Sequence, residues 1–408
     1  MQEWKIYRIG DICKRVCSGG TPKSTEPSYY DGEIPWLNTK EINFNRIIST
    51  EKHITLSGLE NSSAKWIDKN SVIVAMYGAT AAKVAINTIP LTTNQACCNL
   101  SIDETKADYR FVYYWLCSRY TELASLANGG AQQNLNAQQI KDFEIKLPEI
   151  QTQQKIADLL WSIDNKIICN KSINDNLEQQ AQALYKSWFV DFEPFKDGKF
   201  EESEIGLIPE GWCVGKAEDF YEINIGKTPP RKEHEWFTLD KSQNIWVSIS
   251  DLGSDSRFIF DSSEYLTDKA IQKHNIVLVP ENTVLLSFKL TIGRVGIAGT
   301  QLTTNEAIAR FITNSVNREY TYFLLKNFNY SKLGSTSSIA TAVNSKIIKA
   351  MMVLMPNNES LLNFKKLVGP IIDGIKKNEE EILCLTELRN NLLPKLMSGE
   401  LKINDLDC

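Results

Sequence analysis

The sequence has no hydrophobic run long enough to cross a bilayer. A membrane-spanning helix needs roughly 18–20 consecutive apolar residues, and no such run occurs among the 408 residues. Nothing near Met1 resembles a signal peptide. We therefore expect a cytoplasmic protein that has no membrane partner.

The chain also lacks a disulfide framework and a metal-binding pattern. Its nine cysteines are odd in number and include the adjacent pair Cys97-Cys98, but no two have Cys-x-x-Cys spacing. We expect free thiols in a reducing compartment. The three histidines, His53, His234 and His274, are scattered through the chain. No metal site is expected.

No motif of a catalytic site is complete. The segment Ile225–Thr228 (IGKT) resembles the end of a phosphate-binding loop, but Tyr221 stands where that motif requires glycine. Pro229-Pro230 would also block the helix that must follow. No Ser-His-Asp or Cys-His constellation can be assembled. We expect no catalytic residues, and the chain is interpreted as a binding protein.

Excess positive charge is absent as well. The formal net charge of −5 excludes a protein that coats DNA by bulk electrostatics, although it allows local basic loops. With 42% apolar and 23% charged residues, the composition is that of an ordinary soluble globular protein. A chain of 408 residues predicts two or three domains.

What the sequence does contain is a long internal repeat. Leu-Thr-Thr-Asn occurs at 91–94 and again at 302–305, which is 211 positions later. Other segments recur at nearly the same offset: Thr21-Pro22 at 207, Trp36 at 210 and Asn136 at 208. Offsets that drift only from 207 to 211 across the chain indicate a tandem duplication, with about 200 residues per copy.

Each copy begins with a globular part, at 1–148 and at 211–356. Buried strands are predicted at 71–77, 276–279 and 284–288, and helices at 108–126 and 318–328. The fold class predicted for both parts is therefore mixed α/β (α+β).

Each globular part is followed by a predicted long helix, at 149–190 and within 357–408, which also holds the C-terminal tail. Residues 191–210 are the predicted linker. Apolar residues step by four and three, which is the coiled-coil period. Polar residues interrupt this seam at Asn170, Asn174, Asn378 and Arg389. The seam positions are Ile156, Leu160, Ile163, Ile167, Leu177, Leu184, Ile371, Ile375, Ile382, Leu385 and Leu392.

Helix length favours pairing of the two long helices over packing of each on its own domain, which stays the alternative. Ile156 to Trp188 spans 33 residues, about 50 Å at roughly 1.5 Å per residue, and a small domain is narrower. We expect an antiparallel coiled coil that separates the two globular domains with pseudo-twofold symmetry. Pro370 is expected to start or kink the second helix, and Pro394 to bend or end it.

In this order and in two copies, the motifs resemble those of one protein family, the specificity (S) subunits of type I restriction–modification enzymes. The residues that carry the resemblance are Gly19–Pro22, Ile34–Trp36, the two Leu-Thr-Thr-Asn segments, Gln153–Ala157, Ala181–Phe192 and Leu388–Leu401.

The resemblance implies a non-catalytic subunit whose partners do the chemistry. Residues 1–148 and 211–356 would be target-recognition domains 1 and 2, each reading half of a bipartite, gapped, asymmetric site in double-stranded DNA. The helices would measure the spacer and dock two modification (M) subunits, which carry S-adenosylmethionine and methylate adenine. Restriction (R) subunits would use ATP and magnesium, and this chain would bind no cofactor.

Candidate DNA contacts are polar or basic residues in predicted loops, because base edges are read by such side chains. In the first domain they are Thr21, Lys23, Lys40, Lys83, Thr93, Asn94, Gln95, Gln132, Gln133 and Asn134. In the second they are Lys227, Thr228, Arg231, Lys289, Arg294, Thr304, Asn305, Ser337, Ser338 and Thr341.

Each candidate has a structural alternative. A lysine or arginine can be a solvated surface charge, and Thr-Thr-Asn can be a turn or cap, since Thr and Asn side chains bond to nearby backbone. Residues that differ between the copies, such as 132–134 against 340–342, are the better specificity candidates. For the whole chain, a scaffold for protein or glycan partners and an enzyme with an unrecognised site remain the alternatives.

Overall fold

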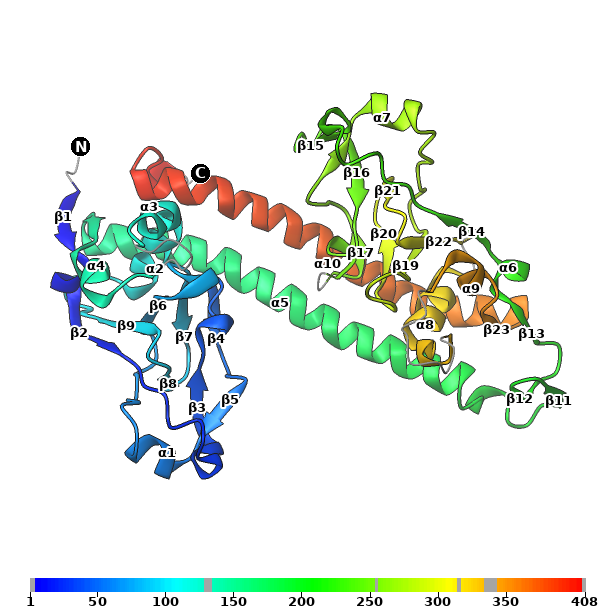
Figure 1. Cartoon of the computed structure of the whole chain (residues 1–408), viewed down its shortest axis with the longest axis horizontal. Helices are drawn as coiled ribbons and strands as arrows, with labels where there is room; N and C mark the ends of the chain where they lie inside the picture. The colour runs from blue at the N-terminus through cyan, green and yellow to red at the C-terminus, as the bar shows by residue number, and fades with distance from the viewer. Residues whose placement is uncertain (1–3, 128–133, 254–255, 314–316, 334–342, 406–408) are drawn as a thin grey trace. The chain divides into compact units, whose positions relative to one another are not determined.

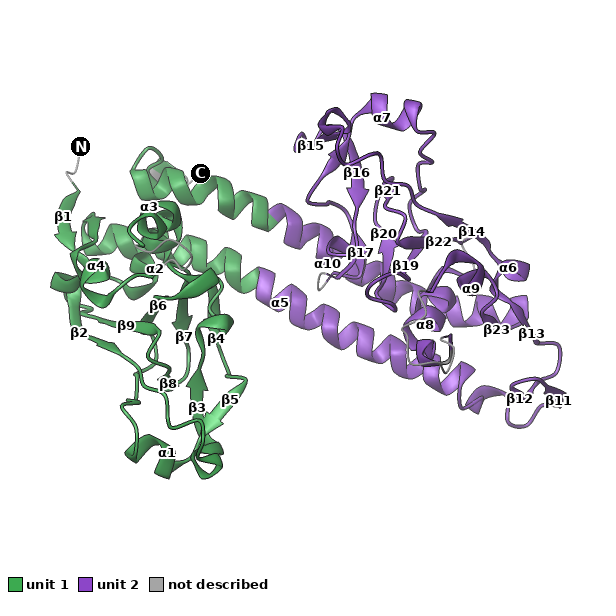
Figure 2. Ribbon diagram, viewed as in Figure 1, with its two compact units in different colours: residues 1–166, 385–408 green, residues 167–384 purple. Residues whose placement is uncertain are grey.

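The structure is a computed structural model that describes residues 4–127, 134–253, 256–313, 317–333 and 343–405. It forms two compact units (Figure 2): unit 1 contains 1–166 and 385–408, and unit 2 contains 167–384. Both long helices, α5 (Ile150–Phe189) and α10 (Asn358–Ser398), contribute residues to both units. Each unit is described by itself.

Unit 1 is built on a five-stranded sheet whose central strands are almost wholly buried. Its helices and strands carry labels in Figure 1. The strand order of this sheet is β2 (Cys13–Ser18), β9 (Cys97–Ile102), β6 (Val72–Ala75), β7 (Val84–Asn87) and β4 (Asn45–Ile47), antiparallel except for the β7–β4 pair. A smaller sheet has the order β5 (Lys52–Ile54), β3 (Tyr30–Leu37) and β8 (Thr92–Thr93). A third pairing joins β1 (Lys5–Arg8) to β10 (Glu144–Leu147).

The described residues of unit 1 also form the short α-helices α1 (Leu56–Glu60), α2 (Tyr109–Ser118), α3 (Tyr120–Ser125) and α4 (Ala137–Asp142). Helix α2 begins where it does because the Asp108 carboxylate accepts hydrogen bonds from the backbone N–H groups of Arg110 and Phe111. The aromatic residues of α2 pack against the five-stranded sheet, the first turns of α5 and Leu396 of α10 in one hydrophobic core. This core fixes the sheet to the long helices within unit 1.

Unit 2 repeats the five-stranded sheet, and its smaller sheet has one strand more than that of unit 1. Its five-stranded sheet has the order β14 (Glu222–Ile225), β22 (Ile308–Ile312), β19 (Val284–Ser287), β20 (Val295–Ala298) and β17 (Phe258–Ile259), with β17 parallel to β20. Its smaller sheet has the order β15 (Phe237–Thr238), β18 (Tyr265–Leu266), β16 (Asn244–Val247) and β21 (Thr303–Thr304). Strand β13 (Cys213–Lys216) pairs with β23 (Met352–Met355).

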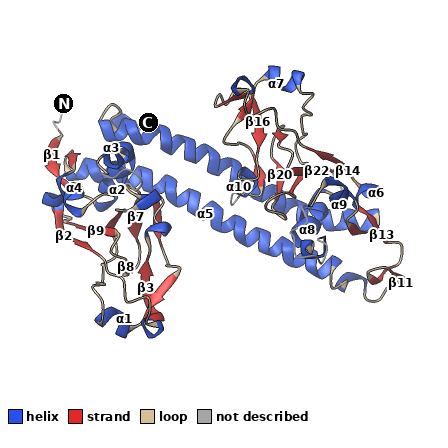
Figure 3. Ribbon diagram, viewed as in Figure 1, coloured by secondary structure: helices blue, strands red, loops and turns tan. Residues whose placement is uncertain are grey.

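The helices of unit 2 are α6 (Ala217–Phe220), α7 (Asp268–Lys273), α8 (Arg318–Asn327) and α9 (Ser345–Lys349). Both units contain strands and short helices as well as parts of the long helices (Figure 3). The predicted class, mixed α/β in two similar globular parts with two long helices, is confirmed.

The long helices pair antiparallel, because the start of one packs beside the end of the other in each unit. In unit 2, Tyr185 and Phe189 near the end of α5 contact Phe364 near the start of α10, with ring centroids 6.4 and 4.8 Å apart. In unit 1, Leu160 near the start of α5 shares a core with Leu396 near the end of α10. The predicted antiparallel pairing is confirmed.

Polar residues lie inside the helix pair. In unit 2, the buried Asn174 side chain donates to the Ile375 carbonyl (3.3 Å) and accepts from the Asn378 amide (2.8 Å). Asn170, also buried, donates to Glu381 at 2.8 Å. In unit 1, Arg389 donates to Asp164 at 2.9 Å. Such pairs satisfy their partners only in one register of the helices.

The apolar seam is unevenly buried. Ile156, Leu160, Ile163, Ile167 and Ile375 are buried. The other predicted seam residues are half-buried: Leu177, Leu184, Ile371, Ile382, Leu385 and Leu392. Ile372, which was not predicted, is buried more deeply than Ile371 beside it.

Pro370 does not start the second long helix, and Pro394 does not end it, so these parts of the two proline predictions were wrong. Helix α10 begins at Asn358, twelve residues before Pro370, and continues through Pro394 to Ser398. A proline removes one backbone donor and frees the carbonyl four residues earlier. Both prolines are exposed, and so are Lys366 and Asn390, whose carbonyls lose their partner. Water can solvate these carbonyls, so the helix persists.

Two further segments differ from expectation. Residues 276–279 form no strand, and only an isolated bridge joins Val279 to Leu302. The predicted linker 191–210 contains a hairpin of β11 (Phe200–Ser203) and β12 (Gly206–Pro209). In both cases the segment is short, and residue type alone does not decide whether a short segment forms a strand, because that depends on a pairing partner elsewhere in the chain.

The Asn174–Asn378 pair generates a test of helix register. We expect Asn174→Leu and Asn378→Leu each to lower the free energy of unfolding by about 1–3 kcal/mol, because each leaves the other amide without its partner. The double variant should lower the free energy of unfolding by less than the sum of the two single decreases.

Urea unfolding of the full chain measures these energies, with Asn176→Leu, an exposed α5 position, as the control. Single costs that add without coupling would show that the two amides do not interact.

Candidate nucleic-acid interface

Most of the candidate DNA contacts that the structure describes lie at one end of each five-stranded sheet. In unit 1, β2 and β6 end beside the starts of β9 and β7, because Ser18 pairs with Cys98 and Val74 with Val84. The end of β3 joins them, since the backbone N–H of Asn94 donates to the Leu37 carbonyl at 3.0 Å. We call residues 19–24, 38–43, 77–83 and 94–96 the loop end of unit 1. Residues 226–231, 248–253, 288–294 and 305–307 form the loop end of unit 2.

The repeated motifs build the same backbone contact at both loop ends, which we call the clasp. In unit 1, a Cβ atom on Gly19 would lie 2.1 Å from the Thr93 carbonyl oxygen. The backbone N–H of Gly20 donates to that oxygen at 2.9 Å, and the Trp36 indole donates to the Gly20 carbonyl at 2.9 Å. The Thr21 hydroxyl donates to the Gln95 side-chain oxygen.

Unit 2 reproduces the clasp bond for bond. A Cβ atom on Gly226 would lie 2.0 Å from the Asn305 carbonyl oxygen. The Lys227 N–H donates to the Thr304 carbonyl (2.9 Å), and the Trp246 indole donates to the Lys227 carbonyl (3.2 Å). The Thr228 hydroxyl donates to a Glu306 carboxylate oxygen.

The Thr-Thr-Asn segments support the clasp with their side chains. Thr92 donates to the Pro35 carbonyl at 2.9 Å and Thr303 to the Ile245 carbonyl at 2.8 Å. The Asn94 side-chain oxygen accepts from the Ala96 N–H at 3.1 Å, and the same turn recurs at Asn305 with 3.0 Å. The Thr-Thr-Asn residues that the two copies share therefore form a turn.

Two candidates are corrected by their burial. Thr93 and Thr304 are each 0% exposed, since β8 and β21 lie beside β3 and β16. Neither hydroxyl can reach a base edge. Asn94 and Asn305 are half-buried and engaged in their turns.

Several basic candidates are engaged with the protein's own loops. Lys83 donates to the Asn43 side chain at 2.8 Å, and Arg294 donates to the Ile249 carbonyl at 2.8 Å. Lys40 forms an ion pair with Glu51. These contacts tie neighbouring loops of the loop end together, which favours a structural role for them.

Arg231 is held most firmly. Its guanidinium binds Glu264 at 2.8 and 2.9 Å and lies 4.2 Å above the Phe237 ring and 4.6 Å from the Trp246 ring. Lys227 donates to the carbonyls of His274 and Asn275 at 3.3 and 3.2 Å. Both side chains place positive charge at the loop end and leave little freedom for reading bases.

The remaining candidates differ in accessibility. Lys23 and Lys289 are exposed at the loop ends, as are Thr21 and Gln95, and Thr228 is half-buried. Asn134 is exposed and bridges to Tyr77 through the backbone. Gln132, Gln133, Ser337, Ser338 and Thr341 lie outside the described residues.

Sequence reasoning missed two apolar residues at the loop ends. Tyr77 is 44% exposed, and Leu290 is 101% exposed with a φ of +60°. Non-glycine residues seldom adopt positive φ. Nothing in the sequence around Leu290 predicts an exposed leucine with a positive φ.

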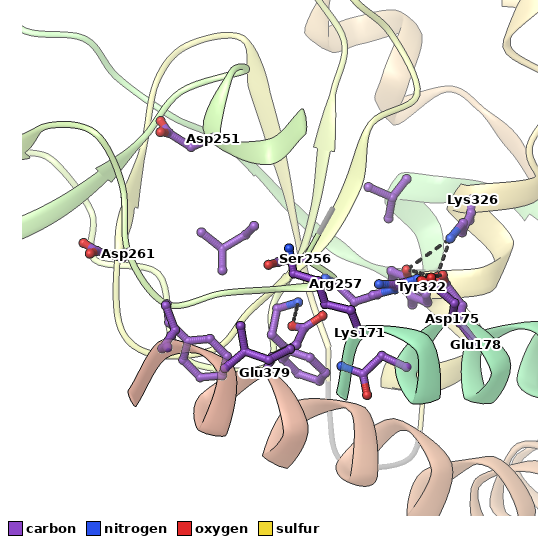
Figure 4. Close-up of a pocket in the computed structure, with 17 residues that line it drawn as sticks. Lys171, Asp175, Glu178, Asp251, Ser256, Arg257, Asp261, Tyr322, Lys326 and Glu379 are labelled. Carbon is purple, nitrogen blue, oxygen red and sulfur yellow. Dashed lines mark hydrogen bonds and ion pairs between the residues drawn. The ribbon is translucent and has the colours of Figure 1, made fainter. Parts of the chain in front are cut away.

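A second site in unit 2 fastens the outer strand β17 to the long helices (Figure 4). A cleft of about 890 Å³ is lined by residues of α5, α8, α10 and the β17 region. Within it, Arg257 donates to Glu178 at 2.9 Å and to Asp175 at 2.6 Å. The Tyr322 hydroxyl donates to Glu178 at 2.5 Å.

Two carboxylates in this cleft have shifted pKa values. Burial raises the pKa of Glu379 to about 7, although its oxygens accept the backbone N–H groups of Arg257 and Phe258 at 2.8 Å. Burial also acts to raise the pKa of Glu178, but hydrogen bonds from Lys326 and Tyr322 outweigh it, and that pKa is lowered. Glu178 is thus the anionic anchor for Arg257.

Unit 1 has a counterpart at its own outer strand. Arg46 of β4 lies 3.3 Å from the centre of the Trp161 ring of α5 and donates to the Trp161 carbonyl at 3.3 Å. The Tyr114 hydroxyl of α2 donates to Asp164 of α5 at 2.5 Å. In each unit, an arginine on the outer strand (Arg46) or directly before it (Arg257) and a tyrosine on the covering helix hold the sheet against α5.

Comparison with known proteins finds a family model that matches most of this chain and several similar chains. The family model described as "Type I restriction modification DNA specificity domain" matches residues 1–179 and 209–366. The specificity subunit of type I restriction enzyme MjaIX from Methanocaldococcus jannaschii is 28% identical over 420 residues, covering 99% of this chain and 95% of that protein. The HindI specificity subunit from Haemophilus influenzae is 23% identical over 470 residues, covering 98% and 100%.

A solved structure shares the fold. The S subunit of a type I restriction-modification system from M. genitalium aligns with a TM-score of 0.59 at 16% identity, covering 96% of both chains. Separately, a search of the described residues finds no helix with the length and hydrophobicity required to span a membrane.

The clasp generates a stability test. We expect Gly19→Ala to lower the free energy of unfolding by about 3 kcal/mol or more, because the new methyl group meets backbone oxygens that have no room to move. Gly374→Ala in α10 should be neutral or stabilising by up to about 1 kcal/mol, since its Cβ meets only Leu177 at 3.7 Å.

Chemical unfolding of both variants gives the comparison. Equal stability of the two would mean that Gly19 does not approach Thr93 as described.

Proposed function

The chain belongs to the family of type I restriction-modification DNA specificity domains, and from this premise we propose that it recognises a bipartite, gapped, asymmetric DNA site. Each loop end reads one half of the site. The observation that carries the proposal is the pair of loop ends, which share one backbone frame and differ in their exposed side chains. A common frame with different side chains suits two related readers of different sequences.

The charge of the chain fits a role in base reading rather than in bulk attraction. Its net charge is −5, and phosphate contacts that supply most of the affinity for DNA require positive charge. We infer that two M subunits supply much of that charge, together with S-adenosylmethionine and adenine methylation. R subunits with ATP and magnesium complete the complex in the cytoplasm.

The long helices support a role in fixing the length of the unread spacer. Helix α5 has 40 residues without interruption, about 60 Å at roughly 1.5 Å per residue. Half-sites on one face of B-DNA recur every 34–36 Å or so. A continuous helix with buried register-setting asparagines is stiff enough to hold a defined spacing.

The proposal predicts a particular methylation pattern. The chain should co-purify with an adenine methyltransferase subunit, and the complex should methylate adenines within two short sequences separated by a constant unread gap. Sequencing that maps methylated adenines across a genome-sized DNA measures this. Methylation at a contiguous palindrome would contradict two separate readers, and an assembled complex without any site preference would contradict the DNA-reading role.

A further inference from the structure

One exposed position of the clasp has the same support and different chemistry in the two units. Gln95 and Glu306 are both exposed, and each directly follows the asparagine whose side chain closes the turn. Each accepts a hydrogen bond from the threonine of the opposing loop, Thr21 or Thr228. Resting on the proposed function, we propose that this position reads one base in each half-site: Gln95 reads adenine and Glu306 reads cytosine.

The hydrogen-bonding groups of the two side chains select these bases. In the major groove, adenine presents the N6 donor beside the N7 acceptor, which matches an amide that accepts and donates at once. The Thr21 hydroxyl donates to Oε1 of Gln95, which leaves Nε2 of Gln95 to donate. The second lone pair of Oε1 can accept from adenine N6.

A carboxylate makes a different match. Glu306 has acceptors only, and cytosine presents an N4 donor in the major groove. Thr228 donates to Oε2 of Glu306. This bond orients the carboxylate and leaves Oε1 to accept from cytosine.

The surroundings compensate for placing a carboxylate against DNA. Lys227 stands where unit 1 has Gly20, since both donate their backbone N–H to the second threonine of the turn. Lys227, Arg231 and His274 line a shallow hollow of about 560 Å³ that also includes Glu306. The acid and the lysine occur together in unit 2, whereas unit 1 pairs a neutral amide with glycine. Nearby cations lower the repulsion between Glu306 and phosphates.

The clasp also explains why this position is suited to base reading. Its backbone is fixed by the close glycine contact and the indole bond, and its side chain is already held by the threonine hydroxyl, so less freedom is lost on binding. Lys23 and Lys289 are exposed at the same loop ends, but a flexible ammonium is a point charge that suits phosphates. Discrimination therefore rests on position 95 or 306 rather than on the lysines.

The test exchanges the two side chains in the complete complex with its M subunits. Wild type, Glu306→Gln, Gln95→Glu and Glu306→Ala are each incubated with duplex DNA of random sequence, and the bound DNA is sequenced. Glu218→Gln, an exposed carboxylate on α6, is the matched control.

We expect Glu306→Gln to change one base of the second half-site from cytosine to adenine, with the first half-site and the gap unchanged. Gln95→Glu should make the opposite change in the first half-site. Glu306→Ala should lose about 5- to 150-fold of the preference at that one position, the range of a single good base contact. The Glu218→Gln complex should select the wild-type site.

Each other outcome is decisive. An unchanged site in all variants overturns the inference, and so does a loss of all selection in both Glu306 variants while the Glu218 control is intact. If Glu306→Gln alone selects nothing, a single relaxed position in Glu306→Ala supports the inference. A wild-type complex that selects no gapped site would instead refute the proposed function.

Discussion

The structure depends on the contact between a glycine backbone and the Thr-Thr-Asn turn. Gly19 and Gly226 approach carbonyl oxygens so closely that any side chain would collide with them. This contact holds the end of the first sheet strand against the small sheet, and it closes the loop end in each unit. A rigid loop end can present a few side chains in fixed positions, which base reading requires.

The outer strand is the second fixed point of each unit. Arg46 binds α5 from the last strand of its five-stranded sheet, and Arg257 does so from the residue before that strand in unit 2. Tyr114 and Tyr322 bind acids of the same helix. Charged groups at such a buried contact must be paired, and their geometry then fixes orientation. The sheet is held at one edge to the helix pair, and the loop end is left open.

The sequence predicted the architecture well and the candidate site only partly. Repeat offsets and heptad spacing reveal two copies and two long helices, because both are encoded in simple periodicities. The Thr-Thr-Asn repeat allows the interpretation as a turn that the structure shows. The burial of Thr93 and Thr304, however, depends on β8 and β21, which have two residues each. Strands that short leave no periodic signal. Arg231 and Arg294 were predicted to contact DNA because the sequence does not reveal their partners. Glu264 lies 33 residues after Arg231, and the partner of Arg294 is a backbone carbonyl, that of Ile249.

The central claim is that two equivalent frames present different side chains to DNA. It is tested most directly by transplanting loop-end residues 19–24, 77–83 and 94–96 onto positions 226–231, 288–294 and 305–307 of the same chain, which are segments of equal length. The DNA selected by the assembled complex is then sequenced. The account predicts that the second half-site acquires bases of the first, while the first half-site and the gap stay the same. An unchanged second half-site in a folded, assembled complex would contradict it.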